Sequence, residues 1–210
     1  MKKSNYLIMR DKMKLEFLKY DQENMIRKFK LNADSEFIYI TLLGRSHRVS
    51  RHTGTVEWSD DGFSTVTEAD YNVAMTIFDV LCKSSPDCTC SGNFRSVHSL
   101  GKPLHSASPG GSLFQPSAAQ FASDPDALDR ACQALGGTKY FAGDVAYVLP
   151  LFDFLPLVFQ FWLPDDEFEA GVSFLWDENT LDFMHFETTF FAAGHVLERL
   201  RNFIQPQSGF

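Results

Sequence analysis

The chain has 210 residues, an apolar fraction of 44% and a formal net charge of −8. A chain of this length suits one domain and buries roughly 70% of its unfolded surface, so it needs neither a disulfide nor a metal simply to fold. The negative charge disfavours nucleic acids and anionic membranes as partners, because both carry negative charge themselves. The 21 Phe residues have no polar group, so they are destined for a core or for a partner surface.

Residues 4–29 are expected to form an N-terminal helical arm. Met13, Phe17 and Tyr20 recur at the spacing of an apolar helix stripe, and charged side chains occupy the other positions. The charge at Arg10 interrupts the apolar segment that a signal peptide requires. The N-terminal sequence is therefore not expected to be a signal peptide.

A small meander of strands is predicted next, over residues 36–43, 48–51 and 55–58. Gly44 and Gly54 mark the two turns between them. A helix should follow, because Thr67 and Asp70 have the spacing of a capping box. Its buried face repeats at helical spacing and consists of Tyr71, Ala74, Met75, Phe78, Leu81 and Cys82.

Residues 86–116 are rich in loop-forming types, with one short strand predicted near 94–98 and a flexible surface loop predicted over 99–116. One helix is expected to begin near Ser117. Another should begin after Asp124, with Pro125 at its first position and glycines past its end.

The segment from Gly143 to Asp177 predicts the central strands of the sheet, because it is rich in Phe, Val, Leu and Trp. Residues 164–167 should form a hairpin-like turn. The segment 145–163 is also long enough to span a membrane. However, Asp153 lies in its middle, and a buried Asp costs about 2.5–3.5 kcal/mol on insertion scales. We therefore expect two strands separated near Asp153 and no membrane span.

The last predicted helix runs from Phe186 to Ile204 and has the most regular apolar periodicity in the chain. Strands and helices do not alternate strictly, which favours an α+β fold. We predict a single domain over residues 1–210. Its largely antiparallel mixed sheet should be packed by an N-terminal helix, a middle helix and the C-terminal amphipathic helix.

Residues 135–197 also carry a recognisable pattern. Leu135-Gly136-Gly137 and Gly143-Asp144 precede Pro150 and Pro156, and these are followed by Trp162, Asp166-Glu167-Phe168 and Phe174-Leu175-Trp176-Asp177. The pattern resembles a bacterial family of unknown function, common in anaerobes, whose members occur alone or fused to iron–sulfur and corrinoid-associated proteins. The resemblance implies a cytoplasmic bacterial protein linked to anaerobic metabolism, and it supplies no catalytic residues.

Acidic residues are the first candidates for a ligand site. Asp165, Asp166 and Glu167, with Glu169 nearby, offer oxygen ligands for Mg²⁺ or Ca²⁺, or a carboxylate pair for acid–base work. A solvated hairpin turn explains the same residues without any function. We predict a ligand-binding groove lined by aromatic side chains and edged by Asp144, Asp153, Asp165 and Glu167.

Cysteine spacing gives a candidate metal site. Cys88 and Cys90 form a C-x-C pair, which chelates less well than C-x₂-C, and His98 and His105 are close enough in sequence to join them. Zinc or an iron–sulfur cluster is the cofactor that these four residues would hold, although the sequence requires no cofactor. Cys82 and Cys132 fall on predicted buried helix faces and are expected to be structural.

Three polar residues of the last helix have simpler interpretations. His185 and Glu187 open the helix, where a carboxylate is favoured by the positive end of the helix dipole. His195 lies one position off the apolar face and is interpreted as a boundary residue.

No nucleophile motif or phosphate-binding loop is present in the sequence. The leading hypothesis is a cytoplasmic module that binds a small molecule or a protein, without catalysis of its own. The alternative is a metal-dependent enzyme or an accessory protein of anaerobic corrinoid or iron–sulfur metabolism. A further possibility is a homo-oligomer in which the many Phe side chains form the subunit interface.

Overall fold

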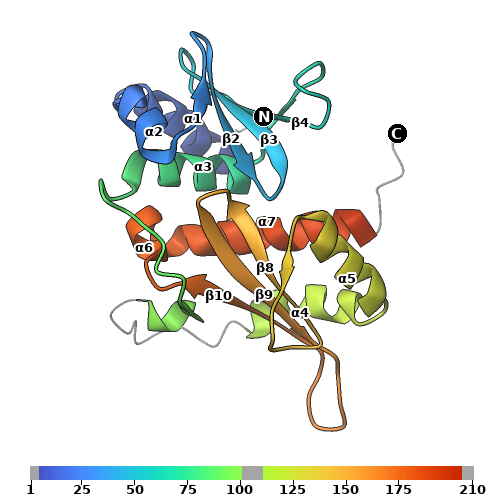
Figure 1. The fold of residues 1–210 in the computed structure, drawn as a ribbon. Helices are drawn as coiled ribbons and strands as arrows, with labels where there is room; N and C mark the ends of the chain where they lie inside the picture. The colour runs from blue at the N-terminus through green and yellow to red at the C-terminus, as the bar shows by residue number, and fades with distance from the viewer. Residues whose placement is uncertain (1–4, 101–110, 205–210) are drawn as a thin grey trace.

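A computed structural model of the chain describes residues 5–100 and 111–204. It confirms the α+β fold (Figure 1). The helices are α1 (Asn5–Phe17), α2 (Gln22–Phe29), α3 (Tyr71–Lys83), α4 (Gly111–Phe121), α5 (Pro125–Ala134), α6 (Thr180–Phe183) and α7 (Phe186–Ile204), with a short 3₁₀ turn at Val97–Ser99. The strands are β1 (Asn32–Ala33), β2 (Phe37–Leu42), β3 (Arg45–Ser50), β4 (Val56–Ser59), β5 (Thr67–Glu68), β6 (Phe94–Ser96), β7 (Thr138–Lys139), β8 (Val145–Phe152), β9 (Leu155–Trp162) and β10 (Gly171–Asp177).

All ten strands of the described residues belong to one sheet, and every pair in it is antiparallel. The order is β5-β4-β3-β2-β8-β9-β10-β6, with β1 on β2 and β7 on β8. The strands β1–β5 with α1–α3 form what we call the N-terminal half, and β6–β10 with α4 and α5 form the C-terminal half. Between the halves, the ladder of β2 and β8 contains the single pair Leu42–Phe152.

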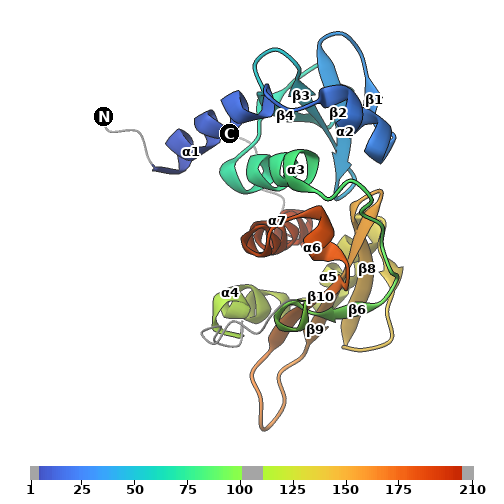
Figure 2. The same cartoon turned by 90° about the vertical axis from the view of Figure 1, so that its left-hand side faces the viewer.

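Helix α7 lies between the two halves. In Figure 2, α3, α7 and α4 are stacked on one side of the sheet, with α7 in the middle. It packs against α3 of the N-terminal half and against α5 of the C-terminal half. The predicted bounds of this helix, Phe186–Ile204, are confirmed, and its Val196, Leu197 and Leu200 are buried.

The strands β8 and β9 form the interior of the C-terminal half, as their Phe-rich sequence predicts. Phe159 and Phe161 are fully buried, and the ring of Phe121 from α4 meets both edge-to-face at 6.1 and 6.3 Å. Such pairs are worth about 0.5–1.5 kcal/mol beyond the burial of their area. The predicted break at Asp153 is confirmed, since it lies in the turn between the two strands. None of the helices that the structure describes has the length and apolar character needed to cross a membrane.

Two helix predictions in the N-terminal half are wrong in detail. The helix expected over 4–29 is two helices, because Asp21 caps α2 by accepting a hydrogen bond from the backbone N–H of Asn24. The expected capping box of α3 is also absent. Thr67 lies in β5, and Asp70 itself caps the helix by accepting from the N–H of Val73 at 3.0 Å.

Two boundaries in the middle of the chain also differ from the prediction. Helix α4 begins at Gly111 rather than near Ser117 and contains Pro116. The short strand expected over 94–98 ends at Ser96 and passes into the 3₁₀ turn. Of the predicted flexible loop, residues 101–110 lie outside the described residues. The start of α5 at Pro125, with Asp124 as its cap, is as predicted.

Candidate functional site

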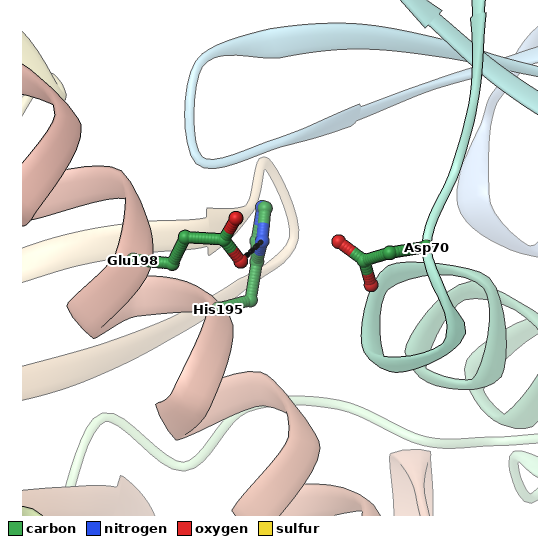
Figure 3. Close-up of side chains that lie close together, drawn as sticks. All are labelled: Asp70, His195 and Glu198. Atoms are coloured by element: carbon green, nitrogen blue, oxygen red, sulfur yellow. Dashed lines mark ion pairs between the residues drawn. The ribbon is translucent and has the colours of Figure 1, made fainter. Parts of the chain in front are cut away.

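A group of polar side chains lies where the N-terminal half meets α7. Asp70 stands at the first turn of α3, and His195 and Glu198 lie three residues apart on one face of α7. In Figure 3 the three side chains point toward one another, from the two helices. One ligand atom from each residue, a ring nitrogen or a carboxylate oxygen, lies within 4.8 Å of the others.

His195 is the buried member of this group. It is 4% exposed, and neither of its ring nitrogens has a hydrogen-bond partner. Its Nδ1 lies 4.0 Å from Oε2 of Glu198, which is too far for a hydrogen bond. An unsatisfied buried polar group costs about 1–3 kcal/mol, so a residue placed this way is expected to meet a ligand or an ordered water.

Two further basic residues beside His195 share this property. His47 on β3 is 1% exposed and Arg199 on α7 is 8% exposed. The Nε2 atom of His47 and the Nε atom of Arg199 are buried without a partner. Among the described residues, these two atoms and the two ring nitrogens of His195 are four of the six buried side-chain polar atoms that lack a partner. The unsatisfied polar groups are therefore concentrated at one place in the fold.

Burial keeps both imidazoles neutral at physiological pH. It lowers the pKa of His195 to about 3, and the positive charges of Arg199 and Arg45, together with any proton taken up by His47, lower it further. It also lowers the pKa of His47 to about 4, although the hydrogen bond to the carbonyl oxygen of Arg45 works in the opposite direction. A neutral imidazole has a nitrogen lone pair, which is the form that binds a metal ion.

The carboxylates at the rim carry the opposite charge. Burial raises the pKa of Glu198, and the negative charge of Asp70 raises it further. Asp70 uses one carboxylate oxygen, Oδ1, to cap α3. Arg45 is occupied elsewhere, because it makes a bidentate pair with Asp60 at 2.9 Å and its guanidinium lies 3.8 Å from the ring of Trp58.

One imidazole and two carboxylates form a ligand set that proteins use for divalent transition metals such as zinc, manganese and iron. A cation between Asp70 and Glu198 would remove the repulsion between the two carboxylates. It would also give the ring of His195 the partner that it lacks. The residues present therefore fit a metal ion.

The carboxylates predicted to edge a ligand groove lie at different places. Asp144 accepts a hydrogen bond from the backbone N–H of Leu163 at 2.7 Å, and Asp165 accepts from the N–H groups of Glu167 and Phe168. Both carboxylates thus close turns at the ends of β8 and β9. Among the described residues, neither of them, nor Asp153 or Glu167, joins a group of three close metal-ligating side chains. Asp153 does line a cleft.

Of the predicted cysteine site, Cys88, Cys90 and His98 join no group of three close metal-ligating side chains among the described residues. Cys88 is half-buried, and burial raises the pKa of its thiol. The thiol of Cys90 donates to the carbonyl oxygen of Phe154, and partial burial raises its pKa to about 11. His98 lines a separate cavity in the C-terminal half, and His105 lies outside the described residues. Cys82 and Cys132 are buried, as expected.

The interpretation of His195 as a boundary residue is wrong, because the side chain is only 4% exposed and belongs to the buried residues of α7. The signal that indicates this site is the His-x-x-Glu spacing of His195 and Glu198, which puts both side chains on one helix face. Asp70 and His47 carry no such local signal, since they come from the start of α3 and from β3 and only the tertiary fold brings them near His195.

His185, which also opens α7 as predicted, has a structural partner. Its backbone N–H and ring Nδ1 both contact the buried carboxylate of Asp79, at 2.7 and 2.6 Å. The hydroxyl of Thr188 donates to the same carboxylate. This arrangement satisfies the first turn of α7 and ties it to α3.

No curated protein and no solved structure is significantly similar to this chain. One family, described as "Domain of unknown function (DUF3786)", matches residues 21–199. The match includes Asp70, His195 and Glu198, and it leaves α1 outside. The chain therefore belongs to this family of unknown function.

Proposed function

We propose that the protein is a metal-binding protein that holds one divalent transition-metal ion between Asp70, His195 and Glu198. The observation that carries the proposal is the imidazole of His195, which is buried with both nitrogens unpartnered and has two carboxylates within 4.8 Å. Burial keeps this ring neutral and able to donate a lone pair.

The proposal agrees with the metal-dependent alternative from the sequence, but it places the metal at different residues from Cys88 and Cys90. Nitrogen and oxygen ligands favour zinc, manganese or ferrous iron over an iron–sulfur cluster, which requires thiolates. Three protein ligands leave positions on the metal for water or for a bound molecule. This supports both a metal-dependent ligand-binding module and a metal-dependent enzyme. The resemblance to a family of anaerobic bacteria, with a cytoplasmic location, remains part of the proposal.

The test is the metal content and metal affinity of the full-length protein, purified without a polyhistidine tag under anaerobic conditions. After treatment with a chelator, Zn²⁺, Mn²⁺, Fe²⁺ and Co²⁺ are titrated separately. We expect one equivalent of at least one of these ions to bind. The visible spectrum of the Co²⁺ protein should report nitrogen and oxygen ligands.

Three variants remove the ligands one at a time. Asp70→Asn is the most informative, because Asn caps a helix about as well as Asp but lacks the negative charge. Together with His195→Gln and Glu198→Gln, it should weaken metal binding by more than about tenfold, as even the loss of a group that supports a ligand costs 10–100-fold. Matched controls are Glu187→Gln, on the same helix, and His52→Gln, which has an exposed side chain. Both should bind as the wild type does.

Two results would overturn the proposal. One is a wild-type protein that binds none of the four ions at millimolar concentration. The other is a set of folded ligand variants that bind as tightly as their controls.

A further inference from the structure

His47 is a second buried imidazole beside the proposed metal site. Side chains alternate between the two faces of a strand, so His47 and Val49, which are buried, share one face of β3, and Ser46 and Arg48 lie on the other. Across the ladder to β2, His47 pairs with the buried Ile40. His47 therefore stands on the face of β3 that packs into the core, where an apolar side chain is usual.

The ring of His47 lies near that of His195. Ile40, its partner on β2, belongs to the same continuous core as Val196, which follows His195 on α7. After burial, the largest influence on the pKa of His195 comes from a proton on His47, ahead of the charge of Arg199 one helical turn away. Such an influence falls with distance. The packing and the electrostatics thus agree in turning His47 toward the metal site.

The hydrogen bonding of His47 leaves one ring nitrogen free to bind a metal ion. Its Nδ1 lies 2.9 Å from the carbonyl oxygen of Arg45. A carbonyl oxygen only accepts, so Nδ1 carries the proton of the neutral ring and donates it to that oxygen. Nε2 then keeps its lone pair, and it is buried without a partner among the described residues. A metal-bound imidazole usually has this arrangement, in which the other ring nitrogen donates to a backbone carbonyl or a carboxylate.

We infer that Nε2 of His47 is a fourth protein ligand of the metal ion held by Asp70, His195 and Glu198. The inference rests on the proposed function, because it adds a ligand to that same centre. Bonds of about 2.0–2.2 Å to the ion place two ligand atoms at most about 4.4 Å apart. The three atoms that lie within 4.8 Å of one another therefore draw together on binding. His47, which is not one of these three residues, closes on the ion in the same step.

The fourth ligand determines which metal the site prefers. Imidazole suits zinc and iron, whereas carboxylates suit manganese and magnesium. With His47, the centre has two imidazoles and two carboxylates, which favours zinc or ferrous iron over manganese. Four protein ligands complete a tetrahedral zinc site, whereas a six-coordinate ferrous ion keeps two positions for a bound molecule.

The test is the ¹⁵N NMR spectrum of the histidine rings in full-length protein labelled with ¹⁵N-histidine. The protein is first treated with a chelator, and one equivalent of Zn²⁺ is then added. In the metal-free protein, we expect the proton of the His47 ring on Nδ1 and none on Nε2. Zn²⁺ should shift the unprotonated nitrogen of two rings, those of His47 and His195. The ring of His52, which has an exposed side chain, should be unaffected.

One variant isolates the contribution of His47. In His47→Gln, Zn²⁺ should shift a single ring, and its affinity should fall by more than about tenfold, as even the loss of a group that supports a ligand has an effect of 10–100-fold. The affinity for Mn²⁺ should fall less, so the ratio of the two affinities decreases. Gln keeps an N–H donor for the carbonyl oxygen of Arg45. The matched control, His52→Gln, should keep two shifted rings and the wild-type ratio.

The possible outcomes separate this inference from the proposed function. Bound Zn²⁺ that shifts only His195 would overturn the inference and leave the metal proposal intact. An unchanged ratio of affinities in folded His47→Gln would do the same. A wild-type protein that binds no metal ion would overturn the proposed function itself. If His47→Gln does not fold, the number of shifted rings in the wild type still decides.

Discussion

His47 and His195 bury two imidazoles in a region that also contains Arg45 and Arg199. The folded state resists protonation of both rings, since burial lowers the pKa of His47 from 6.5 to about 4 and that of His195 to about 3. The unfolded chain takes up these protons near pH 6.5. Stability from this source is therefore complete above pH 6.5 and is lost as the pH falls toward 4, because the unfolded state binds more protons in that range.

This difference predicts a steep pH dependence of the unfolding free energy in metal-free protein. Each of the two residues should contribute a slope of up to about 1.4 kcal/mol per pH unit between pH 6.5 and 4. His47→Gln should reduce the slope, whatever it does to the stability at pH 7. Urea unfolding at a series of pH values in the presence of EDTA measures this slope. His52→Gln should leave it unchanged, and an equally steep slope in His47→Gln would show that the His47 ring titrates normally in the folded state.

At the level of single elements, α1 is the helix that lies outside the family match. It is nevertheless joined to the core. Phe17 is fully buried, with its ring 5.8 Å from that of Phe78, and Arg10 donates to the carbonyl oxygen of Ala69 at 2.9 Å. Through Ala69, this contact reaches the residue next to Asp70. Helix α1 therefore supports the start of α3, on which the metal proposal depends.

We expect Phe17→Ala to lower the free energy of unfolding by about 3–5 kcal/mol, because it leaves a cavity against α3. The matched control is Leu15→Ala in the same helix. The side chain of Leu15 is 64% exposed, so its loss should change stability by no more than about 0.5 kcal/mol. Chemical denaturation of the two variants measures both changes in the free energy of unfolding. If α1 were a loose arm rather than a packed helix, both changes would be small.

The elements that were predictable from the sequence are those whose signal is local. The apolar periodicity of residues 186–204 was sufficient to predict α7, and Asp124-Pro125 was sufficient to predict the start of α5. Both signals depend only on residues that are neighbours in the sequence. The break between α1 and α2 was missed, since the apolar spacing of Met13, Phe17 and Tyr20 continues past the end of α1 at Phe17. The candidate site was mostly missed, because its residues come from β3, α3 and α7 and meet only through tertiary packing.

For the whole molecule, α7 is the element that both halves share. It packs on α3 from one side and on α5 from the other. Its buried side chains, Val196 and Leu200 among them, belong to one continuous core. Neither half therefore has a complete core without this helix, and the two are expected to unfold together.

Two tryptophans allow a test of this cooperativity. Trp58 lies on β4 in the N-terminal half and Trp176 on β10 in the C-terminal half. Variants that keep only one of the two, with the remaining tryptophans replaced by Phe, report each half separately. We expect the fluorescence transitions in urea to have the same midpoint and the same slope. Separate midpoints would show that the halves are independent domains.

The single ladder pair between β2 and β8 has a consequence for access to the interior. We call the contact between β2 and β8 the seam. Next to the Leu42–Phe152 pair, the N–H of Leu43 donates a hydrogen bond across it to the carbonyl oxygen of Leu151. Opening the seam breaks few such bonds, each with a net contribution of about 1 kcal/mol. Amide protons along this seam should therefore exchange with deuterated solvent sooner than those between β8 and β9. The sheet can thus open to a small molecule between β2 and β8 while the strands within each half stay paired.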